Sequence, residues 1–149
     1  MARRPLTLEQ IAEIVKRYRP RGWRIRQSHH RWVWRTALVV WETKTIHVPT
    51  LKDEESLFIF MHEVGHITHG HFRMGLSSHR EEFEAERFAI HIFRTEGIPV
   101  TQSIMNLARL RIQEWIKRDL KEDVVIQPHI ARWAKYGTKL PDAFARDTR

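Results

Sequence analysis

Residues 62–66 read His-Glu-Val-Gly-His, and this pentapeptide constrains the chain more than any other segment. Histidines four residues apart lie on one face of an α-helix, so both imidazoles can reach a single ion. The intervening Glu63 lies about 100° around the helix, where it can contact a metal-bound water without binding the metal. Imidazole and carboxylate donors with one open coordination position suit zinc, which lowers the pKa of its bound water to about 7. The motif therefore predicts a Zn²⁺ site built on His62 and His66.

The sequence around the pentapeptide is typical of a buried helix. Apolar residues surround the first histidine on nearly all sides of the helix; they are Leu57, Phe58, Ile59, Phe60, Met61, Val64 and Ile67. We expect this helix to begin at Thr50, three residues before Asp53, and to end at Gly70. The alternative without a metal is that His62 and His66 are core histidines with protein partners.

A catalytic zinc needs a third protein ligand, and the next predicted helix offers several acidic residues. Ser78 and Glu81 have the spacing of a capping box at its start. Glu82 and Glu86 fall within the apolar arc of this helix, where an unpaired carboxylate is costly. We take Glu82 as the third ligand, with Glu81 as the alternative, and Glu86 as the carboxylate that orients a ligand histidine. In the competing interpretation the inward carboxylates pair with arginines, namely Arg80, Arg87 or a more distant one.

Together the two motifs resemble a known family. The segments His62-Glu63-Val64-Gly65-His66 and Glu82-Phe83-Glu84-Ala85-Glu86-Arg87-Phe88-Ala89 are similar to the gluzincin metallopeptidases, in particular to the ImmA/IrrE-like group that phages and mobile elements often encode. The resemblance covers about residues 44–95. In that group a first-turn glutamate, three residues before an alanine, supplies the third zinc ligand, and it corresponds to Glu82. The chain departs from the group in lacking an evident helix-turn-helix domain and in its tryptophan-rich N-terminal region, so a repressor-cleaving role stays open.

This resemblance implies a hydrolase, a zinc metalloendopeptidase that cleaves a peptide bond in a protein partner. Glu63 is expected to take a proton from the zinc-bound water and to return it to the leaving amine. The oxyanion needs a donor besides zinc, and we expect His79 or His71 to supply it. The alternative function is a basic regulatory module that binds nucleic acid or protein, with a structural or catalytically silent zinc site.

Composition fits one compact protein. The 149 residues suffice for a single domain over 1–149, in which residues 138–149 are expected to form a flexible tail. The absence of cysteine excludes disulfides, thiolate zinc sites and cysteine nucleophiles. Neither a secretory signal nor a membrane-spanning run is recognisable, so we expect a cytoplasmic protein. The net charge of +8 predicts an acidic partner, either nucleic acid or a protein that is acidic or bound to DNA.

The remaining segments predict an α+β fold of the small zincin-like type. An amphipathic helix should start at Thr7 with Gln10, and later helices are expected at residues 101–120 and 128–136. Strands are expected at residues 23–27, 32–41 and 44–48, and short links would join them into an antiparallel meander. The predicted arrangement is an N-terminal helix on a three-stranded antiparallel sheet, followed by the pentapeptide helix and the C-terminal helices.

Two further expectations concern this sheet. Arginines alternate with tryptophans in its first two strands. We interpret this pattern as a half-buried sheet whose arginines lie on the solvent-exposed face. The alternative is a stacking surface for single-stranded nucleic acid. The family resemblance places the third strand at the sheet edge beside the cleft, where an extended substrate would add as one more strand. The residues of this expected substrate edge are Lys44, Thr45, Ile46, His47 and Val48.

Overall fold

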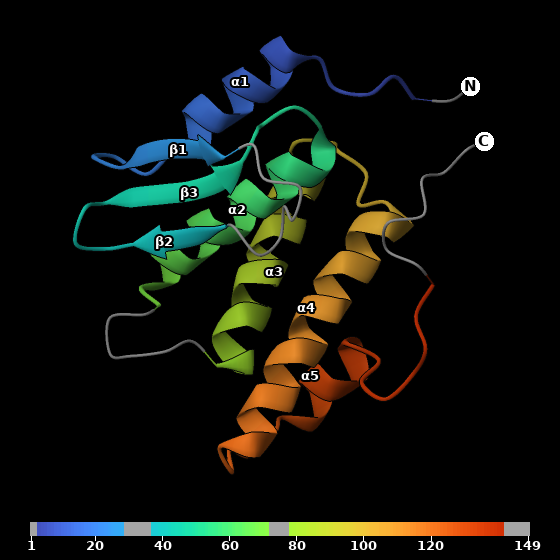
Figure 1. Cartoon of the computed structure of the whole chain (residues 1–149). Coiled ribbons are helices and arrows are strands. Elements are labelled where there is room, and N and C mark those ends of the chain that lie inside the picture. Colours follow the sequence, from blue (N-terminus) through green and yellow to red (C-terminus); the bar gives the residue numbers. More distant parts are fainter. Residues whose placement is uncertain (1–2, 29–36, 72–77, 142–149) are drawn as a thin grey trace. The chain divides into compact units, whose positions relative to one another are not determined.

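The computed structural model describes residues 3–28, 37–71 and 78–141. The elements in these residues are, in order, α1 (Leu8–Tyr18), β1 (Arg24–Ser28), β2 (Leu38–Val40), β3 (Thr45–Pro49), α2 (Glu54–His69), α3 (His79–Thr95), α4 (Gln102–Lys121) and α5 (Pro128–Trp133). The fold is therefore α+β, as predicted. The chain divides into two compact units, a first unit of residues 1–73 and a second unit of residues 74–149. The first unit contains α1, the sheet and α2, and the second contains α3, α4 and α5 (Figure 1). The expectation of a single domain stays a prediction.

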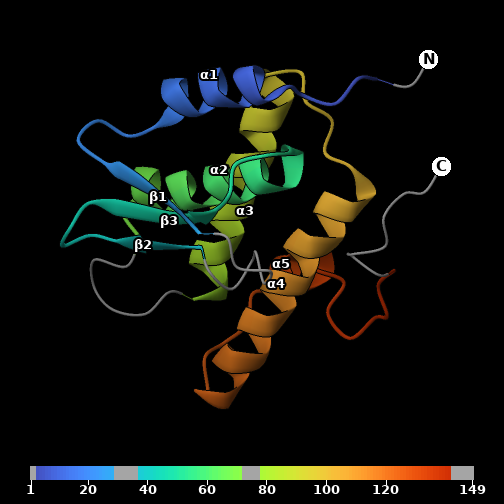
Figure 2. The ribbon, with the colours of Figure 1, turned by 45° about the horizontal axis from the view of Figure 1, so that its top comes forward.

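The first helix begins as the sequence predicts. Thr7 Oγ1 accepts a hydrogen bond from the backbone N–H of Gln10 at 3.1 Å, and Gln10 Oε1 accepts one from the N–H of Thr7 at 2.9 Å. The helix buries Ile11 and Ile14. Both α1 and α2 lie on the same side of the sheet (Figure 2), and α1 packs on α2. This apolar face of α1 therefore anchors the helix in the core of the first unit.

The sheet is mixed, which corrects the predicted antiparallel meander. Its strand order is β1-β3-β2. The hairpin of β2 and β3 is antiparallel as expected, with Val39 opposite Ile46, but β1 pairs with β3 in parallel, with Ile25 opposite Ile46. Residues 29–37 separate β1 from β2. This connection is longer than the short link of a meander, so the chain can return on the other side of β3. Residues 32–36 of the expected second strand lie outside the described residues.

The same topology overturns the expected substrate edge at residues 44–48. Thr45, Ile46 and His47 are paired with β1 on one side and with β2 on the other, and Val48 is paired with β1. Lys44 lies in the turn between β2 and β3, with a φ of 46°. Because the hydrogen-bonding groups of a central strand are already engaged, an extended substrate cannot add there. The edges of the described sheet are β1 and β2.

Two of the N-terminal tryptophans belong to the core of the first unit. Trp23 is buried, and its ring meets that of Trp41 edge to face with the centroids 5.0 Å apart. The indole N–H of Trp41 donates to the backbone oxygen of His71 at 2.8 Å. These contacts agree with the half-buried sheet that we inferred from the sequence. Trp32 and Trp34 lie outside the described residues.

The helix that carries the pentapeptide, α2, begins at Asp53 and not at Thr50. Asp53 Oδ1 accepts from the N–H of Ser56 at 2.8 Å, and Ser56 Oγ accepts from the N–H of Asp53 at 3.1 Å. Thr50 Oγ1 instead donates to the backbone oxygen of Ser28 at 3.3 Å, which ties the end of β3 to the end of β1. Every residue from Ser56 to His66 is buried, as expected of a helix that is apolar on nearly all sides.

Over the described residues 78–141, the second unit contains three helices that pack on one another. Its core cluster comprises Phe83, Ile112, Ile116, Ile130 and Ala134. Ser78 is the N-cap of α3, but its side chain makes no capping hydrogen bond, so the predicted capping box with Glu81 is wrong. Asp119 of α4 satisfies this helix start instead, because its Oδ2 accepts from the backbone N–H of His79 at 2.8 Å. In the described part of the chain, no helix combines the length and the apolar character needed to cross a membrane.

Candidate metal centre

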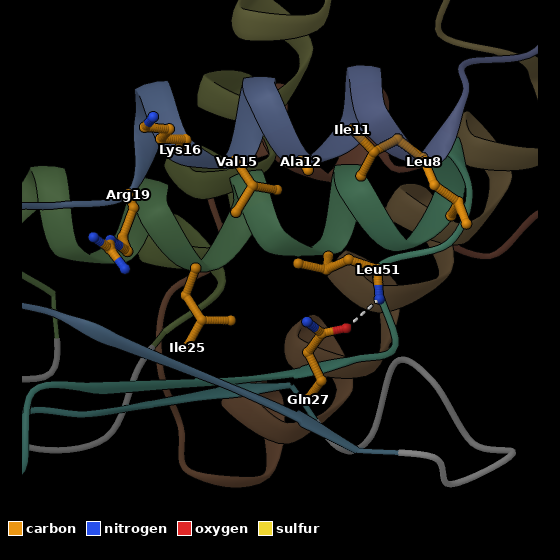
Figure 3. A pocket seen from close by; sticks show the side chains of 9 residues that line it. All are labelled: Leu8, Ile11, Ala12, Val15, Lys16, Arg19, Ile25, Gln27 and Leu51. Atoms are coloured by element: carbon orange, nitrogen blue, oxygen red, sulfur yellow. Dashed lines mark hydrogen bonds between the residues drawn. The ribbon is translucent and has the colours of Figure 1, made fainter.

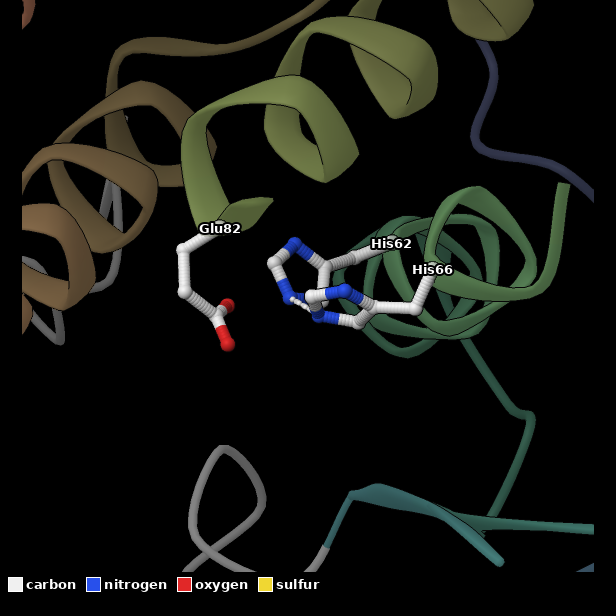
Figure 4. A group of neighbouring side chains, drawn as sticks. All are labelled: His62, His66 and Glu82. Atoms are coloured by element: carbon white, nitrogen blue, oxygen red, sulfur yellow. Dashed lines mark hydrogen bonds between the residues drawn. The ribbon is translucent and has the colours of Figure 1, made fainter. Parts of the chain in front are cut away.

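The two histidines of the pentapeptide point at a common position. His62 and His66 are one turn apart on α2, and each side chain is 1% exposed. Their Nε2 atoms lie 3.0 Å apart, and their rings meet edge to face at a centroid distance of 4.6 Å (Figure 4). Two nitrogens bound to one tetrahedral zinc at about 2.0–2.1 Å lie about 3.3 Å apart. The imidazoles therefore have close to the separation that joint binding of one ion requires.

Glu82 is the third member of this group. It lies in the first turn of α3 and is 4% exposed. One ligand atom from each of His62, His66 and Glu82 lies within 4.8 Å of the other two (Figure 4). Among the described residues, these three form the one buried cluster of histidine and acidic side chains with the spacing for a metal ion. Two imidazoles and one carboxylate are a donor set that catalytic zinc sites use, so the residues present fit Zn²⁺.

The other two acidic candidates of α3 differ from Glu82. Glu81 is half-buried and does not belong to the cluster. Glu86 is fully buried, and its Oε1 lies 2.8 Å from Nε of Arg111 on α4. Arg111 is thus the distant arginine of the competing interpretation, and its charge compensates the burial of the Glu86 carboxylate. The expected role of Glu86 in orienting a ligand histidine stays a prediction.

His71, which we expected to serve as an oxyanion donor, lies against the ring of His66 instead. His71 is 5% exposed, and its Nδ1 lies 2.9 Å from Nδ1 of His66. A ring nitrogen that binds a metal carries no proton, so binding through Nε2 leaves the proton of a neutral His66 on Nδ1, where it donates to His71. The contact therefore favours His71 as a positioning residue for His66 over the oxyanion donor that we expected.

Local backbone geometry explains why His71 lies next to His66. Gly70 ends α2 in the left-handed conformation, with φ 69° and ψ 29°. The N–H of Gly70 donates to the oxygen of Ile67 at 3.1 Å, and the N–H of His71 donates to the oxygen of His66 at 2.9 Å. This is the Schellman motif, in which the residue after the glycine contacts the residue that is third from the helix end. The sequence signal for this contact was Gly70, the residue that ends the helix, followed directly by His71.

His79, the other expected oxyanion donor, has both ring nitrogens engaged in the second unit. The backbone N–H of Gln127 donates to its Nε2 at 3.1 Å, so that nitrogen accepts and the ring proton is on Nδ1. Nδ1 in turn donates to Asp119 Oδ2 at 2.6 Å. With its side chain fully buried and its one N–H given to Asp119, His79 has no proton to donate to an oxyanion. These contacts favour a structural role for His79, which holds the start of α3 to α4, over the oxyanion donor that we expected.

Glu63, the expected proton acceptor, lies in the same buried stretch of α2 as the two histidines and is 4% exposed. Buried carboxylates are uncommon because burial removes their hydration, and they are found where a polar partner or a chemical role compensates. The position of Glu63 next to His62 is compatible with the proton transfer predicted from the pentapeptide.

No protein-family model matches this chain, and searches of curated proteins and of solved structures find no match either. The resemblance to the ImmA/IrrE-like group therefore rests on residues 62–66 and 82–89.

Proposed function

We propose that the protein is a zinc-dependent metalloendopeptidase that cleaves a peptide bond in a partner protein. The observation that carries this proposal is the convergence of His62 and His66, whose Nε2 atoms lie 3.0 Å apart in a buried group with Glu82. Two imidazoles and one carboxylate are the donors that a catalytic zinc takes from a protein. The glutamate within the histidine pair separates this site from a purely structural one, since a structural zinc site has no use for a proton acceptor.

In this proposal His62, His66 and Glu82 hold the ion. When bound, zinc acts as a Lewis acid that polarises the scissile carbonyl and makes water a better nucleophile near neutral pH. Glu63 accepts the proton of the attacking water and transfers it to the amine that leaves. His71 fixes the ring orientation and the tautomer of His66 through the Nδ1 contact at 2.9 Å.

The variant Glu63→Gln tests whether the Glu63 carboxylate is needed for catalysis and not only for the structure. This variant keeps the size of the side chain and much of its hydrogen bonding, but it cannot accept a proton. We expect unchanged zinc content and thermal stability, and a loss of about 10²–10⁴-fold in the rate at which a mixture of synthetic peptides is cleaved, measured by mass spectrometry. Glu55→Gln makes the same chemical change at an exposed position in the first turn of α2. It should retain the wild-type rate within about twofold.

Two results would count against the proposal. Turnover by Glu63→Gln at the wild-type rate would remove the residue from the mechanism. A wild-type protein that binds zinc tightly but cleaves no peptide in the mixture would favour the alternative of a regulatory module with a silent site.

A further inference from the structure

A groove between α1 and β1 lies entirely within the first unit and uses none of the proposed metal ligands. Figure 3 shows the side chains that line it. Its volume is about 400 Å³, which falls in the range of about 300–1,000 Å³ that is usual for ligand sites. Most of the side chains that line it are aliphatic: Leu8, Ile11, Ala12, Val15, Ile25 and Leu51. Gln27 of β1 closes the sheet side of the groove, where its Oε1 accepts from the N–H of Leu51 at 2.9 Å.

The helical side of the groove is an apolar stripe that remains accessible. Leu8, Ala12 and Val15 are spaced i, i+4 and i+7, so they lie on one face of α1. Ile11 is buried beneath them, whereas Leu8 is 65% exposed, Ala12 is exposed and Val15 is half-buried. A single exposed leucine is ordinary on a protein surface. A row of accessible apolar residues that opens into a groove is more typical of a binding surface.

One end of the groove is positively charged. Lys16 and Arg19 line it at the C-terminal end of α1 (Figure 3). They belong to a stretch between Glu13 and Glu42 that contains eight basic residues and no acidic one. Six of the eight lie in the described residues and all six are exposed: Lys16, Arg17, Arg19, Arg21, Arg24 and Arg26. A helix C-terminus favours cations. This preference accounts for the basic residues at the end of α1, but it does not account for the arginines of β1.

We propose that this groove docks a peptide segment of a partner protein, in which aliphatic side chains are followed by acidic residues. The aliphatic side chains would fill the space between Val15 and Ile25, and the carboxylates would pair with Lys16 and Arg19. The lining favours a peptide over single-stranded nucleic acid, because none of the lining residues is aromatic and bases bind such grooves chiefly by stacking. The proposal does not depend on peptidase activity. If the protein is a peptidase, the groove would bind a segment of the substrate other than the one that contains the scissile bond.

The experiment selects ligands from a library of short random peptides displayed on phage, with the whole zinc-loaded chain as the target. We expect enriched peptides to combine at least two aliphatic residues with neighbouring acidic ones. A fluorescent copy of the most enriched peptide is then titrated by anisotropy. Ala12→Trp, which fills the groove, and Lys16→Glu, which reverses its charge, should each weaken binding by about tenfold.

Arg17→Glu is the matched control for Lys16→Glu. It makes the same charge change at the adjacent position of α1, but Arg17 does not line the groove, so binding should weaken by about twofold at most. Circular dichroism and thermal unfolding verify that each variant is folded. Ala12→Trp and Lys16→Glu alter exposed positions, which makes global unfolding an implausible cause of lost binding.

Three outcomes would overturn the proposal. They are the absence of any enriched peptide, enrichment of peptides without acidic residues, and wild-type affinity of Ala12→Trp for the selected peptide. A labelled single-stranded oligonucleotide serves as the competing probe. If it binds the wild type, is weakened equally by Lys16→Glu and Arg17→Glu, and is unaffected by Ala12→Trp, the basic surface binds phosphates and the peptide groove is refuted.

Discussion

Two buried histidine networks, one in each unit, use the same side chain for different purposes. His79 of the second unit and His66 of the first are 0% and 1% exposed, so burial does not distinguish them. What differs is the group that faces each ring nitrogen. His79 meets a carboxylate on one side and a backbone N–H on the other. The ring nitrogens of His66 face other histidines, with His71 at Nδ1 and His62 at Nε2.

This difference separates a structural histidine from a metal ligand. The partners of His79 fix one tautomer and leave neither ring nitrogen available, so the network stabilises the fold without a ligand. The pair of His62 and His66 brings two ring nitrogens to within 3.0 Å of each other, where they can share one proton or bind one cation together. Breaking the first network should therefore cost stability, and breaking the second should cost zinc affinity.

The largest effect on stability is expected from Asp119→Ala. The change removes the acceptor of the backbone N–H and of Nδ1–H of His79, and it leaves both donors buried without that partner. We expect a loss of about 2–4 kcal/mol in the free energy of unfolding, measured by urea denaturation of the metal-free protein. A loss below about 0.5 kcal/mol would mean that the network does not stabilise the second unit.

The next effect concerns zinc affinity and His71. In His71→Ala the Nδ1–H of His66 loses its acceptor, and we expect affinity for zinc to fall by about 10–100-fold, measured by competition with a chelator. His71→Asn offers a side-chain oxygen in place of Nδ1 and should recover part of this loss. His69→Ala is the control, since this exposed histidine hydrogen-bonds the backbone oxygen of Gly65 and its ring lies beside that of His71, with the centroids 5.4 Å apart. Equal losses in His71→Ala and His69→Ala would contradict a positioning role for His71.

The smallest effect is expected from Gly70→Ala. Its φ of 69° lies in the left-handed region, where a side chain costs about 1 kcal/mol. We expect the free energy of unfolding to fall by about that amount, with a few-fold loss of zinc affinity because His71 follows directly. Gly70→Asn, whose side chain tolerates this conformation, should lose less in both measurements. If Gly70→Ala lowers stability but leaves zinc affinity unchanged, the turn does not position His71.

Local patterns predicted the helices well and the sheet poorly, for a physical reason. The capping box of Thr7 and Gln10, the end of α2 at Gly70 and the buried surroundings of His62 depend on neighbours within a few residues. Strand order depends on contacts between distant segments. The alternation of apolar residues in β1 and β3 is the same whether the strands pair in parallel or through a meander, so the sequence could not exclude the latter.

The roles of the histidines illustrate the same limit. His62 and His66 could be identified because the helix itself sets their spacing. His79 could not be recognised as structural, because its partners Asp119 and Gln127 lie 40 and 48 residues away in sequence. The start of α2 was misassigned for a local reason. Thr50 and Asp53 are both good N-cap residues, and the reciprocal bonds with Ser56 select Asp53.

The central claim is that His62, His66 and Glu82 bind one zinc ion, and metal analysis with chelator competition tests it most directly. We expect the purified chain to hold about one tightly bound zinc. His62→Ala and Glu82→Ala should abolish tight binding, whereas Glu81→Ala should retain it. Because the chain has ten histidines, the chelator is needed to remove weakly bound surface metal. Absence of tight zinc from the wild type after incubation with the metal would contradict the claim, as would loss of zinc in Glu81→Ala with normal binding in Glu82→Ala.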